Sequence, residues 1–236
     1  MDTRPFHFKS FSLHHHRSTM KVGTDAVLLG IWTDLTNVRS ALDVGTGCGI
    51  ISLLLASRAQ VSVDAIELDK DSFEEAKQNF GESPYSDCFR IFNSDFNDFV
   101  PPKNKKYDLI ISNPPFFVND LRSTDPKKRM ARHTQTLTYD RLLKVSMELL
   151  NPNGKISVVL PYRESRLFLQ QAILAGFFVE KKMLIFPMLG KEPNRINILI
   201  GHKSVEEQTE KFMIRDEYGE FTNQYVDFVK DYYVSV

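Results

Sequence analysis

Apolar and polar residues alternate along the chain in blocks that predict buried strands separated by amphipathic helices. Short, continuous apolar runs are typical of strands that are covered on both faces, as in a parallel sheet. Segments with apolar residues at helical spacing follow most of these runs, and parallel strands need such crossover connections. Strands are predicted at residues 41–44, 61–68, 89–93, 107–112, 155–161, 180–187 and 195–203.

Helices are predicted between these strands, at residues 26–32, 50–59, 72–80, 138–150 and 163–175. Thr24 or Asp25 is the expected N-cap of the first helix, because both side chains accept hydrogen bonds from free backbone N–H groups. A turn near residues 190–194 joins the last two strands, and so short a connection requires an antiparallel pair. The sequence therefore predicts an α/β fold: a doubly wound, mostly parallel seven-stranded sheet with one antiparallel edge strand.

The two ends of the chain are predicted to pack on this sheet as short elements. Phe6, Phe8 and Phe11 alternate with polar residues in an N-terminal extension, residues 1–22, which indicates a strand or hairpin. Residues 204–236 form an acidic tail in which aromatic residues at helical spacing predict a docking helix. No linker rich in Gly, Pro or Ser divides the 236 residues, so we expect a single domain.

Composition favours a globular protein of the cytoplasm. Hydrophobic residues make up 42% of the chain and charged residues 25%, as in ordinary globular domains. No apolar run approaches the roughly 18 residues of a membrane span, and the first residues lack the apolar core of a signal peptide. Cys48 and Cys88 suggest no disulfide framework and fit a reducing compartment. We expect a cytoplasmic protein with no membrane partner.

The net charge is zero, but the charges are unevenly distributed along the chain. Residues 122–133 carry five basic side chains against one acid, and residues 1–21 carry four against one. Residues 204–236 hold eight acids and three bases. Such asymmetry can give a neutral molecule one basic face, which indicates a nucleic-acid partner. Solvated loops of mixed charge are the alternative.

Three adjacent histidines, His14, His15 and His16, invite comparison with metal sites. Neighbouring side chains of an extended segment point to opposite faces, so these three rings do not easily converge on one ion. We therefore predict no metal site, and the sequence assigns no other role to the triplet.

A glycine turn follows the first predicted strand and precedes a helix, with Gly45, Gly47 and Gly49 at alternate positions. Strand, glycine turn and helix begin a nucleotide-type βαβ unit, and glycines let a ligand approach the backbone closely. The spacing differs from the dinucleotide motif GxGxxG, and no Lys-Ser or Lys-Thr pair follows as a phosphate loop would require. The turn thus indicates a ligand without naming it.

Acidic residues end the next two strands. Glu67 lies 18 residues after Gly49, where an acid at the end of the second strand meets ribose hydroxyls. A carboxylate accepts two hydrogen bonds from a vicinal diol. The alternative is an acid that caps the helix starting near Asp71. Asp95 and Phe96 follow the third strand and suit an adenine, because the carboxylate can accept from its amino group and the ring can cover one face. The alternative is a polar strand end above a buried ring.

The tetrapeptide Asn113-Pro114-Pro115-Phe116 ends the fourth strand, residues 107–112. Two consecutive prolines remove two backbone donors, so the chain must turn and present an amide and a ring beyond the strand. Ligands of open parallel sheets bind at this edge, and these groups suit a flat, amino-bearing substrate. A simple strand stop is the alternative. Residues 117–136, which lack periodicity and carry the basic cluster, are predicted to be a substrate-binding loop.

The chain resembles the class I methyltransferases that use S-adenosylmethionine in four segments that occur in order: LDVGTGCGIISLLLA, AIELD, SDF and NPPF. It is similar, more specifically, to the bacterial tRNA adenine-N6 methyltransferases that modify valine tRNA beside the anticodon, in KVGTDAVLLGIW, LIISNPPFF, RMARH and FTNQYVDFVKDYYV. The likeness covers nearly the whole chain. It implies a Rossmann-like fold, S-adenosylmethionine as cofactor and tRNA as partner, and we expect a monomer.

The resemblance implies that Asn113, Pro114, Pro115 and Phe116 carry the reaction. The Asn113 side-chain oxygen and the Pro114 carbonyl each accept one N–H of an adenine amine, and Phe116 stacks on the extruded base. The expected cofactor site comprises Thr24, Asp43, Gly45, Thr46, Gly47, Gly49, Glu67, Asp95, Phe96 and Asn113. RNA contacts are expected from Lys21, Lys127, Lys128, Arg129, Arg132 and His133.

Other substrates fit the same tetrapeptide. Guanine-N2 of ribosomal RNA and the glutamine of release factors also present a planar amine or amide, so the tetrapeptide alone does not separate these reactions. An RNA-binding module without activity, on the same scaffold, is a hypothesis of another class. The intact glycine turn, Glu67 and Asn113 oppose it, and binding of S-adenosylmethionine would distinguish the two.

Overall fold

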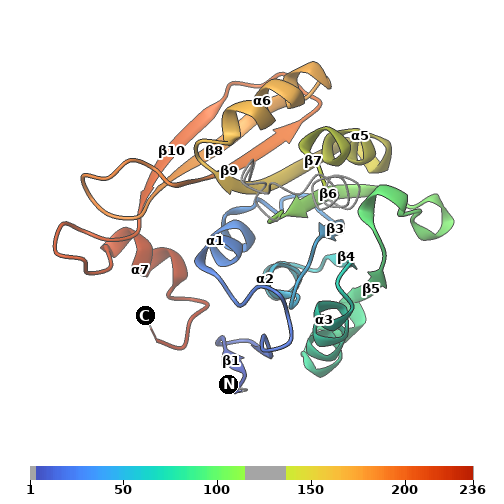
Figure 1. Ribbon diagram of the computed structural model, residues 1–236, viewed down its shortest axis with the longest axis horizontal. Helices are drawn as coiled ribbons and strands as arrows, with labels where there is room; N and C mark the ends of the chain where they lie inside the picture. The colour runs from blue at the N-terminus through green and yellow to red at the C-terminus, as the bar shows by residue number, and fades with distance from the viewer. Residues whose placement is uncertain (1–3, 115–136, 236) are drawn as a thin grey trace, which may run out of the picture.

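A central sheet with helices on both faces forms the body of the protein (Figure 1). The computed structural model describes residues 4–114 and 137–235. Within them, eight strands form the sheet in the order β10-β8-β9-β7-β6-β3-β4-β5. These strands are β3 (Ser40–Val44), β4 (Ser62–Glu67), β5 (Phe89–Asn93), β6 (Tyr107–Ser112), β7 (Leu150–Pro161), β8 (Phe178–Phe186), β9 (Arg195–Gly201) and β10 (Gln208–Met213).

Two layers of helices bury the two faces of the sheet. One layer consists of α1 (Thr24–Trp32), α2 (Ile50–Arg58), α3 (Lys70–Glu82) and α7 (Asn223–Val229), and the other of α5 (Tyr139–Leu149) and α6 (Ser165–Leu174). Side chains of a strand alternate between the layers: Val158 and Leu160 of β7 join the core under α5 and α6, whereas Val159 joins the core under α1. Burial on both faces accounts for the continuous apolar runs of the sequence.

The predicted doubly wound α/β class is confirmed, but the sheet differs from the prediction in two respects. Within the described residues it has eight strands rather than seven, because β10 pairs with β8 at one edge. Phe212 is the single fully buried residue of β10, so this strand carries no apolar run that predicts it. The antiparallel strand is β9, and it lies between β7 and β8 rather than at an edge. Its buried run, residues 196–201, suits an interior strand.

The start of α1 also differs from the prediction. Gly23 is the N-cap, and because glycine has no side chain it makes no side-chain capping hydrogen bond. Thr24 is instead the first helical residue. Asp25 pairs with Arg195 of β9, with 2.7 Å between Oδ2 and Nε. One of the side chains expected to cap the helix therefore joins α1 to the sheet.

The described ends of the chain lie near each other (Figure 1). β1 (Phe6–His7) and β2 (Ser12–Leu13) form a two-stranded antiparallel hairpin. The Phe8 ring stacks on Tyr233, with 5.3 Å between the ring centroids. Among the described residues, no helix is long and apolar enough to cross a membrane.

Candidate active site

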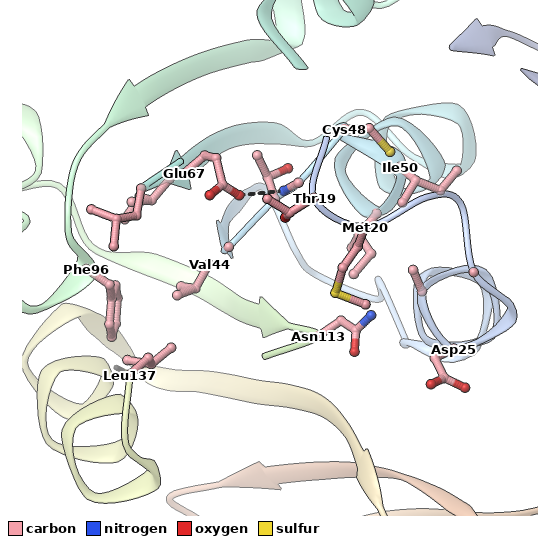
Figure 2. Close-up of a pocket in the computed structure, with 18 of the residues that line it drawn as sticks. Thr19, Met20, Asp25, Val44, Cys48, Ile50, Glu67, Phe96, Asn113 and Leu137 are labelled. Atoms are coloured by element: carbon pink, nitrogen blue, oxygen red, sulfur yellow. Dashed lines mark hydrogen bonds between the residues drawn. The ribbon is translucent and has the colours of Figure 1, made fainter. Parts of the chain in front are cut away.

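A cavity of about 430 Å³ lies at the carboxyl ends of β3, β4 and β6 (Figure 2). Its volume is within the usual range for a small-molecule site, and its position is the edge where open parallel sheets bind ligands. The glycine turn forms one wall, and residues 19–21 together with the start of α1 form another. Glu67, Asp95, Phe96 and Asn113 complete the lining from the strand ends.

The glycine turn presents bare backbone to the cavity. Gly45 and Gly47 have φ angles of +72° and +58°, in the left-handed region that favours glycine. The N–H groups of Gly45 and Thr46 donate to the Ile66 carbonyl at 2.9 and 3.0 Å, which fixes the turn against β4. Apart from the adjoining residues, no atom of the described part of the chain lies within 4 Å of the position that a Cβ would occupy at Gly45 or Gly47. A ligand can therefore approach the backbone here.

Gly49 belongs to the same turn but does not line the cavity. It is the N-cap of α2 with a φ of +90°. A Cβ at this position would lie 2.5 Å from Cε1 of Phe80. The glycine thus lets α2 pack against α3, and its expected contact with the cofactor gives way to a packing role.

Asp43 lies beneath the turn, fully buried and outside the cavity lining. Its Oδ2 accepts hydrogen bonds from the hydroxyls of Thr46 and Ser52, both at 2.7 Å. Burial raises the pKa of Asp43 to about 6, although these two hydroxyls lower it. Asp43 therefore supports the turn from below, and the Thr46 hydroxyl donates its hydrogen bond to this carboxylate.

Glu67 links β4 to the glycine turn. Its Oε2 accepts from the backbone N–H of Gly47 at 2.8 Å (Figure 2). Its Oε1 accepts from the N–H of Asp69 at 2.9 Å. Each oxygen keeps capacity for a further hydrogen bond. The cap of α3 is Asp69, which accepts from the N–H of Ser72 at 2.9 Å. The alternative role of Glu67 as the helix cap is thereby excluded.

Asp95 and Phe96 both line the cavity next to β5. Oδ1 of Asp95 accepts from the backbone N–H and the side-chain amide of Asn97, both at 2.8 Å. The Phe96 ring is buried and stands near Leu137 at one end of the cavity (Figure 2). The structure thus shows the alternative of the sequence analysis, a polar strand end above a buried ring. Because Asp95 and Phe96 also line the cavity, both side chains can contact a ligand.

Asn113 follows β6 and lies in the wall of the cavity. The Ser112 hydroxyl before it donates to the Val44 carbonyl at 2.8 Å, which holds the end of β6 against β3. The Oδ1 atom of Asn113 is buried, and no group of the described residues donates to it. A buried acceptor without a donor is costly, so this oxygen suits a ligand that carries an N–H group.

Some of the predicted site residues lie outside the described part of the chain, and some residues that were not predicted line the cavity. Those outside are Pro115, Phe116, Lys127, Lys128, Arg129, Arg132 and His133. Thr24 lines the cavity as predicted, and Lys21, expected at the RNA, lines it as well. Thr19 and Met20 were missed, and the Met20 side chain extends toward Asn113 (Figure 2). No sequence pattern distinguishes them, because distant contacts place their segment.

Comparison with known proteins identifies the family. The family model described as methyltransferase small domain matches residues 16–182. A tRNA1(Val) (adenine(37)-N6)-methyltransferase of Tolumonas auensis is 36% identical over 99% of this chain and 98% of its own length. The chain belongs to this methyltransferase family. Solved structures agree on the fold: a predicted O-methyltransferase from Agrobacterium tumefaciens has a TM-score of 0.66 at 16% identity, covering 88% of this chain and 96% of its own.

A second solved structure carries a ligand. It is the glycopeptide N-methyltransferase MtfA complexed with S-adenosyl-L-methionine, with a TM-score of 0.53 at 12% identity over 76% of this chain and 93% of its own. In the present chain, the cavity offers an open glycine backbone, a carboxylate with spare acceptor capacity and an amide oxygen that no described residue bonds. These groups fit a nucleoside that carries an amino acid. Among the described residues, no cluster of three or more His, Cys, Asp or Glu side chains could hold a metal.

Proposed function

We propose that the chain transfers the methyl group of S-adenosylmethionine to the exocyclic N6 of adenine 37 in valine tRNA, the reaction named for its relatives. One observation carries the proposal: the buried Asn113 Oδ1 lies in the cavity wall without a donor among the described residues. The exocyclic amine of adenine has two N–H groups, and one of them supplies the donor that this oxygen lacks.

Asn113 and Pro114 act on the amine. The lone pair of this nitrogen is delocalised into the adenine ring, so the free amine is a poor nucleophile. Acceptance of one N–H by Asn113 Oδ1 and of the other by the Pro114 carbonyl favours a pyramidal nitrogen with its lone pair directed at the methyl donor. The same two oxygens stabilise the positive charge that develops on nitrogen. Bound S-adenosylmethionine supplies an electrophilic sulfonium methyl group and is left as S-adenosylhomocysteine when the methyl–sulfur bond breaks. The methylated, cationic amine loses its extra proton to water.

The remaining cavity residues bind and orient the cofactor. Glu67 accepts from the ribose hydroxyls with the acceptor capacity that Gly47 and Asp69 leave. The backbone at Gly45 and Gly47 admits the cofactor closely, and Asp95 and Phe96 contact its adenine. Asp43 and Gly49 hold the turn in place and do not touch the ligand.

The RNA is bound by the end of the tetrapeptide and by the basic segment that follows it. Phe116 stacks on the adenine, and the RNA backbone is contacted by Lys127, Lys128, Arg129, Arg132 and His133. All of these residues lie outside the described part of the chain, and the support is that they follow Asn113 and Pro114 in the sequence. A target in a single-stranded loop suits this arrangement because its bases are easily splayed out. We place the enzyme in the cytoplasm, since both described cysteines are free thiols. We expect it to act as a monomer.

The alternatives are methylation of guanine-N2 or of a protein glutamine, and binding of RNA without catalysis. The first two share the planar amino group, and the name of the relatives favours tRNA adenine. An inactive module has no need for a cavity with an unpartnered amide oxygen. No specific contact of the described residues favours any of the three.

Methylation of in-vitro transcribed tRNAs with radiolabelled S-adenosylmethionine, followed by identification of the nucleoside, tests the proposal. We expect N6-methyladenosine in valine tRNA and none in a transcript whose adenine 37 is replaced by guanine. Label in N2-methylguanosine or in protein would favour one of the alternatives, and absence of cofactor binding would favour an inactive module.

A further inference from the structure

The histidine triplet belongs to a segment, residues 14–21, that we call the N-terminal strap. Its first five residues lie against α3, and its last three, Thr19, Met20 and Lys21, line the cavity. Ser72, Glu75 and Asn79 of α3 are spaced by three and four residues and therefore share one face of the helix. All three side chains are buried, with exposed fractions of 0 to 1%. This polar face receives the strap.

Glu75 is the centre of the contact. Its Oε1 accepts from the backbone N–H groups of His16 and Arg17, both at 2.9 Å. Its Oε2 accepts from the N–H and the hydroxyl of Ser18, at 2.8 and 2.5 Å. One buried carboxylate therefore binds four donors from three consecutive residues of the strap.

A carboxylate suits this position better than any neutral side chain. Burial raises the pKa of Glu75, but the hydrogen bonds from Ser18, Arg17 and His16 outweigh burial and hold it below the ordinary value. The ring of His16 and the guanidinium of Arg17 also lie near Oε1, at 3.4 and 4.0 Å. A glutamine has a single acceptor oxygen and would direct an N–H₂ group at two of the four donors.

Asn79 and Ser72 extend the contact to both sides of Glu75. Oδ1 of Asn79 accepts from the His14 N–H at 2.8 Å, and its amide donates to the carbonyls of His14 and Cys48, each at 2.8 Å. The Ser72 hydroxyl accepts from the Thr19 N–H at 3.2 Å. Since Cys48 belongs to the glycine turn, α3 holds the strap and the glycine turn, two walls of the cavity, in one register.

We propose that Glu75 is a positioning residue for cofactor binding: it anchors residues 16–18 of the strap so that Thr19–Lys21 close the cavity and Met20 faces Asn113 (Figure 2). The inference deepens the proposed function and rests on it. Release of the anchor leaves Asn113 and Glu67 in place but opens the cavity wall that Thr19, Met20 and Lys21 form. Cofactor affinity then falls, while chemistry at saturating cofactor is retained.

Calorimetric titration of the tRNA-free protein with S-adenosylmethionine tests the inference in the variants Glu75→Gln and Glu74→Gln. Glu74 is an exposed neighbour on the same helix, so the second variant makes the same chemical change away from the strap. We expect Glu75→Gln to raise the Kd about tenfold or more, and Glu74→Gln to leave it within about twofold. In steady-state assays, KM for S-adenosylmethionine rises with Glu75→Gln, whereas kcat and KM for tRNA stay within about twofold.

Hydrogen exchange separates release of the strap from unfolding. In Glu75→Gln, amides 16–18 should lose protection while amides of β3 and β4 keep it. An unchanged Kd in a variant with released strap amides would overturn the inference. If β3 and β4 also lose protection, Ser18→Ala, which removes one donor from the strap side, takes its place and should raise the Kd about threefold; no change would equally overturn it. Failure of the wild-type protein to bind S-adenosylmethionine would instead contradict the proposed function.

Discussion

The carboxylate of Glu67 accepts a hydrogen bond from the backbone N–H of Gly47 at 2.8 Å, and this contact joins the end of β4 to the glycine turn after β3. The second carboxylate oxygen accepts from the N–H of Asp69 at 2.9 Å. Both oxygens are thus fixed before any ligand arrives, and little side-chain entropy is lost when a diol binds.

Glu67→Gln should weaken the binding of S-adenosylmethionine, because one acceptor oxygen becomes an N–H₂ group that faces a backbone donor. We expect the Kd from calorimetry to rise about tenfold to a hundredfold. Asp71→Asn, an exposed acid in the first turn of α3, is the matched control and should bind as the wild type does. Equal affinity of the Glu67 variant would remove this carboxylate from the cofactor site.

Asn113→Ala should separate binding from chemistry. The variant loses the oxygen that accepts the substrate N–H but keeps the glycine turn and Glu67, so S-adenosylmethionine affinity should be nearly unchanged. We expect kcat for tRNA methylation to fall about a hundredfold or more, as when one transition-state hydrogen bond is removed. Asn153→Ala, at an exposed asparagine near the start of β7, serves as the control. Retained turnover would exclude Asn113 from the mechanism.

Replacement by alanine should lower the stability of the protein to different extents at two glycines of the same turn. Gly49→Ala combines a left-handed backbone with a Cβ that meets Phe80, and we expect it to lower the free energy of unfolding by roughly 2–4 kcal/mol. The methyl group of Gly47→Ala meets no atom of the described residues beyond its chain neighbours, so only the backbone cost of about 1–2 kcal/mol remains. Its methyl group lies at the cavity, and cofactor affinity should fall. Urea denaturation and calorimetry measure the two effects, and equal losses of stability would contradict this account.

Asp43→Asn should change how stability depends on pH. The pKa of Asp43 is raised to about 6 in the folded protein, so the folded state holds a proton between roughly pH 4 and 6 that the unfolded state has lost. Stability contributed by this group therefore falls as pH rises through that interval. The asparagine variant should lack this loss, so the difference in free energy of unfolding between variant and wild type should shift by on the order of 3 kcal/mol in favour of the variant from pH 4 to pH 7. Urea denaturation at pH 4 to 7 gives the comparison, and parallel pH profiles of the two proteins would refute it.

Local patterns predicted most of the elements that position the site. β5 and β6 have the predicted bounds. In β6, continuous apolar residues mark a strand that is covered on both faces. β5 is an edge strand with Arg90 in its run, and its aromatic and β-branched residues mark it. The glycine turn and the end of β6 were also placed from sequence, since glycine and proline restrict the backbone wherever they occur. β10 escaped prediction because its residues are mostly exposed, and pairing with β8 alone makes it a strand.

The sequence by itself determined the fold class, the family, and the residues that meet at the strand ends: Glu67, Asp95 and Asn113. Only the tertiary structure decided that β9 enters between β7 and β8, that Asp43 and Gly49 support the turn from outside the cavity, and that the strap forms its wall. Periodicity records which face of an element is buried, but not its distant partner. The donors that bind Glu75 are mainly backbone N–H groups 57 to 59 residues away in sequence, and nearly every residue carries such a group. A sequence pattern cannot mark them, and folding alone brings them to one carboxylate.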